Sequence, residues 1–143
     1  MIVVDLNLLL YSTNADALPH DRARRWWEDL LSRGEDVGLA WTVVLGFLRL
    51  TTNPRVMPRP LAPEQAMAII DDWFSQPAVR SLEPTVRHWA ILKEILAPLG
   101  TAANLTSDAH LAALAIEHGA RLHSADNDFA RFAGLRWENP LSD

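Results

Sequence analysis

The sequence has no cysteine, and this absence excludes several kinds of chemistry at once. Without a thiol the chain forms no disulfide, no thiolate nucleophile and no cysteine-ligated zinc site. No apolar run approaches the roughly 20 residues of a membrane-spanning helix. The apolar N-terminus carries Asp5 and no basic leader. We therefore expect a cytoplasmic protein without a signal peptide or a membrane contact.

Positive charge is also scarce. The net charge is −5, and Lys93 is the only lysine. This balance argues against a protein that coats nucleic acid through bulk charge. It does not exclude a nuclease, because metal ions in an acidic pocket can supply positive charge locally. The other basic residues are arginines, whose forked guanidinium groups suit phosphate, but a GC-rich genome is the better explanation of this bias.

The 143 residues fit a single domain, 1–143, in which short apolar runs alternate with amphipathic segments. We expect strands at 2–5, 37–40, 79–82, 121–124 and 135–137. We expect helices at 6–12, 20–33, 41–51, 63–75, 85–97 and 108–118, the last of them ended by Gly119. Strands that alternate with helices predict an α/β fold with a central parallel sheet between helical layers.

Acidic residues follow the predicted strands at similar places. Asp5 ends the first strand, Asp108 opens a helix after a polar turn, and Asp126 and Asp128 follow the strand 121–124. Ligands bind outside the carboxyl ends of the strands in open parallel sheets, so these side chains are expected to converge. Two unit charges about 4 Å apart repel by roughly 4 kcal/mol at an effective dielectric of 20. A hard divalent metal would offset this repulsion.

Each of these acids also has a purely structural interpretation. Asp108 could be a helix N-cap, Asp5 could cap the helix that follows it, and Asp126 and Asp128 are common turn residues. Spacing alone therefore leaves both interpretations open.

Three stretches resemble a known family. The segments DLNLLLYS (5–12), FLRL with TNPR (47–55) and TSDAHLAALAIEHGARLHSADNDFARFAGLRWENPL (106–141) are similar to the VapC toxins of bacterial toxin–antitoxin systems, a branch of the PIN-domain nucleases. The third stretch is the most specific, because an acid, an alanine-rich helix, a glycine, a short strand and a second acid follow in order.

The resemblance implies a PIN fold, a three-layer α/β/α architecture, and metal-dependent endoribonuclease activity with Mg²⁺ or Mn²⁺. It implies that Asp5, Asp108 and Asp126 bind the metal and carry catalysis. It also implies that Asp128 is a further metal ligand and that Asn7 and Ser124 are polar residues that support the metal site.

One position departs from the family pattern. Gly46 stands within the helix 41–51 where the family often has a glutamate. A glycine inside a helix costs roughly 1 kcal/mol relative to alanine, so we expect close packing at this residue. The missing acid leaves the strength of metal binding and the number of ions open.

Two arginines near the expected mouth of the site, Arg49 and Arg55, are candidates for contacts with RNA phosphates, or for ion pairs on the surface. The resemblance also implies a homodimer and an antitoxin that fills a groove, for which the tryptophan-rich helix 20–33 is suited. A housekeeping RNA-processing nuclease and an inactive RNA- or protein-binding module are the alternatives. A phosphoaspartate receiver is disfavoured, because Lys93 lies in a predicted helix.

Overall fold

The computed structural model describes residues 1–142 and contains a five-stranded parallel sheet. Its strand order is β3-β2-β1-β4-β5, so the chain moves outward from the central strand in one direction and then in the other. The strands are β1 (Ile2–Val4), β2 (Val37–Ala40), β3 (Val79–Leu82), β4 (Arg121–His123) and β5 (Trp137–Glu138). This doubly wound parallel topology confirms the predicted fold class.

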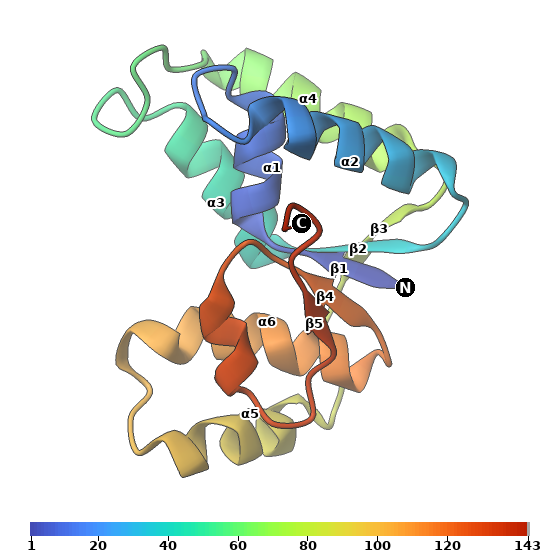
Figure 1. The fold of residues 1–143 in the computed structure, drawn as a ribbon, viewed down its shortest axis with the longest axis vertical. Helices are drawn as coiled ribbons and strands as arrows, with labels where there is room; N and C mark the ends of the chain where they lie inside the picture. Colours follow the sequence, from blue (N-terminus) through green and yellow to red (C-terminus); the bar gives the residue numbers. More distant parts are fainter. Residues whose placement is uncertain (143) are drawn as a thin grey trace.

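Six α-helices form the outer layers. Helices α1 to α4 lie on one side of the sheet, and α5 and α6 lie on the other (Figure 1). They are α1 (Leu6–Thr13), α2 (His20–Ser32), α3 (Trp41–Thr51), α4 (Pro63–Ser75), α5 (His88–Leu96) and α6 (Thr106–Glu117). A 3-10 turn, η3 (Asn127–Arg131), follows β4, and two more, η1 (Ala97–Leu99) and η2 (Ala103–Leu105), connect α5 to α6.

The central strands form the floor of the core. All residues of β1 and β2 are buried, as expected for parallel strands covered on both faces. On the α1–α4 side, Trp27 of α2 and Phe47 of α3 both pack edge-on against Trp73 of α4. Among the described residues, no helix is long and apolar enough to cross a membrane.

Three elements begin two or three residues away from their predicted starts, and one of these differences matters for the site. Helix α6 begins at Thr106, so Asp108 lies inside its first turn and does not cap it. Helix α5 begins at His88 and not at residue 85, because the Glu117 carboxylate accepts a hydrogen bond from the backbone N–H of Thr85, in the turn that precedes the helix. The last strand is Trp137–Glu138 and not 135–137.

Candidate metal centre

The first feature of the site is the pair of loops that leave the neighbouring strands β1 and β4. Asp5 follows β1 directly and caps α1, with its Oδ1 accepting a hydrogen bond of 2.7 Å from the Leu6 backbone N–H. Ser124 follows β4 and is fully buried. Because β1 and β4 are adjacent and parallel, their carboxyl ends place these two residues side by side.

Ser124 links the two loops through its hydroxyl group. Its Oγ donates to Asp5 Oδ2 at 2.6 Å and accepts from the Asp126 backbone N–H at 3.0 Å. It also accepts from Asn7 Nδ2 at 3.2 Å, and Asn7 Oδ1 accepts from the Ala125 N–H at 3.4 Å. The structure thus brings together Asp5, Asn7 and Ser124, as the sequence predicted. Their hydrogen bonds hold one Asp5 oxygen and the start of the 124–128 turn in fixed positions.

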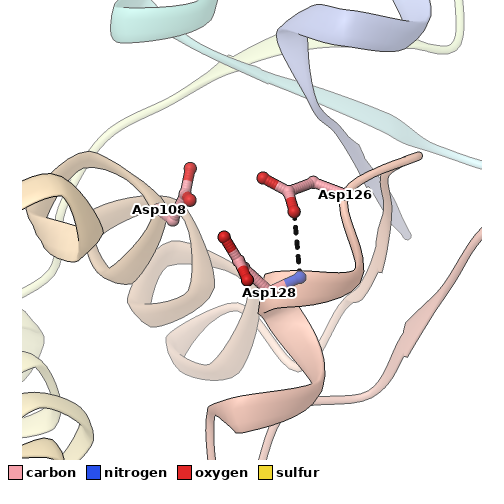
Figure 2. A group of neighbouring side chains, drawn as sticks. All are labelled: Asp108, Asp126 and Asp128. Atoms are coloured by element: carbon pink, nitrogen blue, oxygen red, sulfur yellow. Dashed lines mark hydrogen bonds between the residues drawn. The ribbon is translucent and has the colours of Figure 1, made fainter.

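Three further carboxylates face one another across this turn. Asp126 accepts a hydrogen bond from the Asp128 N–H at 2.9 Å and caps η3, so it is a turn residue, which leaves its other carboxylate oxygen free to face Asp108. Asp108 points toward Asp126 and Asp128 from the first turn of α6 (Figure 2). One oxygen from each of the three carboxylates lies within 4.8 Å of the other two. Residues far apart in sequence therefore present three oxygen atoms to one point.

The proximity of these acids changes their ionisation. Burial, followed by repulsion from Asp5, Asp126 and Asp128, raises the pKa of Asp108 from 3.8 to about 6. Burial also raises the pKa of Asp5, against the opposing effect of the Ser124 and Leu6 hydrogen bonds. The carboxyl group of Asp108 therefore resists ionisation in the absence of a cation.

The opposite wall of the site belongs to α3 and contains no carboxylate among the residues that line it. A cavity of about 180 Å³ lies between Asp5, Asp108 and this helix. A Cβ built at Gly46 would lie 2.7 Å from Leu6 Cδ2, so the predicted close packing at this glycine is correct. The Leu6 side chain occupies the space that a longer residue at position 46 would need.

Among the predicted arginines, Arg49 lines this cavity and Arg55 does not. Arg55 lies in the turn after α3 and is exposed. The cavity wall also includes Thr42 and Ser107, which the sequence analysis did not identify. Both could have been predicted from their spacing, because Thr42 stands one helical turn before Gly46 and Ser107 directly precedes Asp108.

The donor set fits a hard divalent cation. Carboxylate oxygens are the ligands that Mg²⁺ and Mn²⁺ prefer, whereas zinc sites usually need nitrogen or sulfur. Asp128 has a cationic neighbour, Arg131, but the separation is 3.8 Å and the Asp128 side chain is 49% exposed. Among the described residues, no ion pair involves Asp5, Asp108 or Asp126. The cluster can therefore accept external positive charge.

The tryptophans of α2 and His110 lie outside the acidic cluster. Trp27 is buried in the core and Trp26 is half-buried against His123, so α2 presents one partly exposed indole and not a tryptophan-rich apolar face. His110, close to Asp108 in sequence, contacts His88 instead. The sequence analysis missed the network that His88 and His110 form with the buried Glu117 between α5 and α6.

Comparison with known proteins identifies the family. The PIN domain family model matches residues 2–135. The chain is 46% identical over 140 residues to Ribonuclease VapC37 of Mycobacterium tuberculosis, covering 98% of this chain and 97% of the relative. It is 45% identical to Ribonuclease VapC33 and 37% identical to Ribonuclease VapC48 of the same species, covering at least 96% of each chain.

Solved structures show the same fold at low sequence identity. VapBC2 from Rickettsia felis, bound to a DNA fragment from its promoter, matches with a TM-score of 0.72 and 19% identity, covering 97% of this chain and 98% of the other. VapC20 of Mycobacterium tuberculosis, described as a sarcin-ricin loop cleaving toxin, matches with a TM-score of 0.63 and 20% identity, covering 95% and 99% of the two chains. The family match, the identity over nearly the whole chain and the shared fold place this chain in the PIN-domain family, among the VapC ribonucleases.

Proposed function

We propose that this protein is a metal-dependent endoribonuclease that acts as the toxin of a toxin–antitoxin pair. The observation that carries the proposal is the convergence of Asp108, Asp126 and Asp128 within 4.8 Å, beside the half-buried Asp5. A site that gathers carboxylates at a cost in ionisation is suited to a divalent cation. RNA is the proposed substrate because the curated relatives are named ribonucleases.

In this proposal Asp5, Asp108 and Asp126 are catalytic and hold Mg²⁺ or Mn²⁺, and Asp128 is a further ligand. When bound, such an ion stabilises charge on a phosphate and lowers the pKa of a bound water. Ser124 and Asn7 orient Asp5 and the 124–128 turn through the hydrogen bonds given above. Arg49 lies on the cavity wall without an ion pair among the described residues, so its guanidinium is available to an RNA phosphate. Arg55 does not line this cavity, so its proposed contact with an RNA phosphate lies outside it.

The proposed protein partners are a cognate antitoxin and a second copy of the chain. Several solved neighbours are complexes named VapBC, which supports the antitoxin, although their identity to this chain is under 25%. Exposed apolar side chains support a homodimer: Trp41 is 46%, Leu45 is 59% and Trp89 is 66% exposed. We also propose that the chain forms a single domain and that the protein acts in the cytoplasm.

A second candidate follows from Gly46. Because the α3 wall offers Leu6 and no carboxylate, a PIN-fold module that binds RNA or protein without cleaving it is the alternative function. The two candidates differ in one property, which is metal-dependent cleavage. An RNA-processing nuclease without an antitoxin differs from a toxin in that its overproduction would be harmless to the cell.

The test is RNA cleavage by purified, antitoxin-free protein with Mg²⁺ or Mn²⁺ and with EDTA, alongside Asp5→Asn and the control Asp71→Asn on the exposed face of α4. The proposal predicts cleavage by the parent and by Asp71→Asn, and none with EDTA or with Asp5→Asn. Absence of cleavage by well-folded parent protein would reject the nuclease in favour of the binding module.

A further inference from the structure

A groove of about 850 Å³ lies outside the acidic site, between α2 and the C-terminal residues that follow β5. Its walls include Arg22 and Arg25 of α2, Arg33 directly after this helix, and the indole of Trp26. His123 and Glu138 contribute to it from the neighbouring strands β4 and β5. The groove therefore combines guanidinium groups with an aromatic ring along one helix.

The position of this groove relative to the acids is set by β4. His123 lines the groove, and the next residue, Ser124, hydrogen-bonds the Asp5 carboxylate. Consecutive Cα atoms are about 3.8 Å apart. The part of the groove at His123 therefore lies next to the carboxyl end of β4, where the acidic site begins, while Arg33 lies toward the other end of the groove. An extended ligand in the groove would approach the acids at His123.

The distribution of charge explains why such a surface is needed. The net charge is −5 and the acidic site holds four carboxylates, so RNA phosphates are repelled unless cations elsewhere attract them. Arg59, Arg80 and Arg121 form ion pairs with acids of this chain. By contrast, no carboxylate among the described residues lies within ion-pair distance of Arg25 or Arg33, and both are exposed.

The buried histidine of the groove supplies an independent observation. His123 is 2% exposed, and its Nδ1 accepts a hydrogen bond from Trp26 Nε1 at 3.3 Å. In the neutral imidazole this places the proton on Nε2. That atom has no hydrogen-bond partner among the described residues; Glu138 Oε1 lies 3.1 Å away but outside hydrogen-bond geometry. The groove therefore contains a buried ring nitrogen whose nearest acceptor, Glu138 Oε1, is poorly aligned with it.

We propose that this groove binds the RNA strand that flanks the cleaved bond, with phosphates on Arg25 and Arg33 and a base against the Trp26 indole. The inference rests on the proposed function, since it assigns a path to the same substrate. Asp29 and Glu138 also line the groove, so phosphates are expected to bind at the guanidinium groups and away from these carboxylates. Base–aromatic stacking and arginine–phosphate contacts are the usual elements of single-strand binding.

The test compares two variants of equal net charge. Arg25→Gln with Arg33→Gln removes two of the three arginines that line the groove. Arg24→Gln with Arg136→Gln removes one cation of α2 and one next to β5, neither of which lines the groove. Binding of a labelled single-stranded RNA is measured in EDTA, where cleavage is blocked, over about 50 to 200 mM salt. Cleavage by each variant is measured separately with Mn²⁺. The indole N–H NMR signal of Trp26, assigned with Trp26→Phe, reports on the groove itself.

The groove variant is expected to bind RNA about tenfold more weakly and to lose about 1.4 from the slope of log affinity against log salt, since each phosphate contact to a single strand contributes about 0.7. The control variant keeps the parent affinity and slope, and RNA shifts the Trp26 signal. Equal RNA affinities for the two variants would overturn the inference, as would a Trp26 signal that shifts with an acidic peptide but not with RNA.

The outcome is separable from that of the proposed function. A parent protein that binds RNA through the groove but cleaves nothing leaves the groove standing and rejects the nuclease. If the parent cleaves RNA and the groove and control variants bind RNA with equal affinity, the nuclease stands and the groove is rejected.

Discussion

Ser124 Oγ donates a 2.6 Å hydrogen bond to Asp5 Oδ2, although the two residues are 119 positions apart in the sequence. The same hydroxyl accepts the N–H of Asp126, so one buried side chain connects acids from two loops. The arrangement of the site therefore depends on the parallel pairing of β1 with β4, which aligns the ends of these strands.

Replacing this hydroxyl is expected to affect both stability and activity. Ser124→Ala leaves the Asp126 N–H and Asn7 Nδ2 without their acceptor in a buried place, which costs about 1–3 kcal/mol in the free energy of unfolding. Cleavage is expected to fall because Asp5 loses its orienting donor. Urea denaturation and RNA cleavage measure the two effects, with Ser75→Ala at the exposed end of α4 as the control. A cleavage rate unchanged by Ser124→Ala would refute the orienting role.

The raised pKa of Asp108 predicts an unusual pH dependence of stability without metal. Its folded-state pKa of about 6 exceeds the ordinary pKa of an aspartate, 3.8. Between these values the folded protein therefore binds more protons than the unfolded chain. The contribution of Asp108 to stability is fully present below about pH 4 and is lost as the pH rises through about 6. In EDTA near neutral pH, Asp108→Asn is expected to raise the melting temperature.

The same ionisation governs the binding of a cation. A divalent ion binds the ionised carboxylate, so the stabilisation of the parent by Mn²⁺ is expected to grow as the pH rises through about 6. Thermal denaturation with Mn²⁺ and with EDTA, at about pH 5 and about pH 7.5, measures this difference. An Mn²⁺-induced shift of equal size at both pH values would contradict the assignment of Asp108 as a ligand.

The packing of Gly46 predicts how the missing acid can be restored. Gly46→Glu alone is expected to displace the Leu6 side chain, because its Cβ would lie 2.7 Å from Leu6 Cδ2. Leu6→Ala opens this space, so the double variant is expected to be more stable than the sum of the two single effects predicts. It is also expected to bind Mn²⁺ more tightly than Leu6→Ala alone. Strictly additive stabilities in urea would show that Leu6 does not restrict position 46.

The network between α5 and α6 predicts a large loss of stability at Glu117. The buried carboxylate accepts hydrogen bonds from the Thr85 N–H and faces His88 Nδ1, and His88 Nε2 contacts His110 Nδ1 at 2.9 Å. Glu117→Ala leaves these groups unpartnered, so we expect a loss of about 3 kcal/mol in the free energy of unfolding. The exposed Glu94→Ala on α5 is expected to change it by less than about 0.5 kcal/mol. Similar losses for the two variants in urea would argue against the network.

Local patterns in the sequence were sufficient for the elements but not for their contacts. The apolar run 2–4 and the proline at Pro63 marked a buried strand and a helix start, because burial and backbone restriction leave local signals. Asp108 was misplaced as the first residue of α6, because the polar stretch before it reads as a turn and not as the first turn of a helix.

Long-range relationships left weaker signals. The acids were predicted to converge because each follows a strand or opens a helix of a parallel sheet. The contact between Leu6 and the Gly46 position, and the lining of a groove by Arg25 together with His123, depend on how α1, α2 and α3 pack on that sheet. Periodicity shows which face of a helix is buried, but not which residue of another element it meets.

The central claim is that the carboxylates hold a divalent ion, and Mn²⁺ binding measured by electron paramagnetic resonance tests it most directly. The parent protein is titrated near neutral pH, together with Asp126→Asn and the surface control Asp71→Asn. We expect the parent and the control to bind Mn²⁺ equally, and Asp126→Asn to bind it at least about tenfold more weakly. Equal Mn²⁺ affinities for all three proteins, or no binding by the parent, would contradict the metal centre.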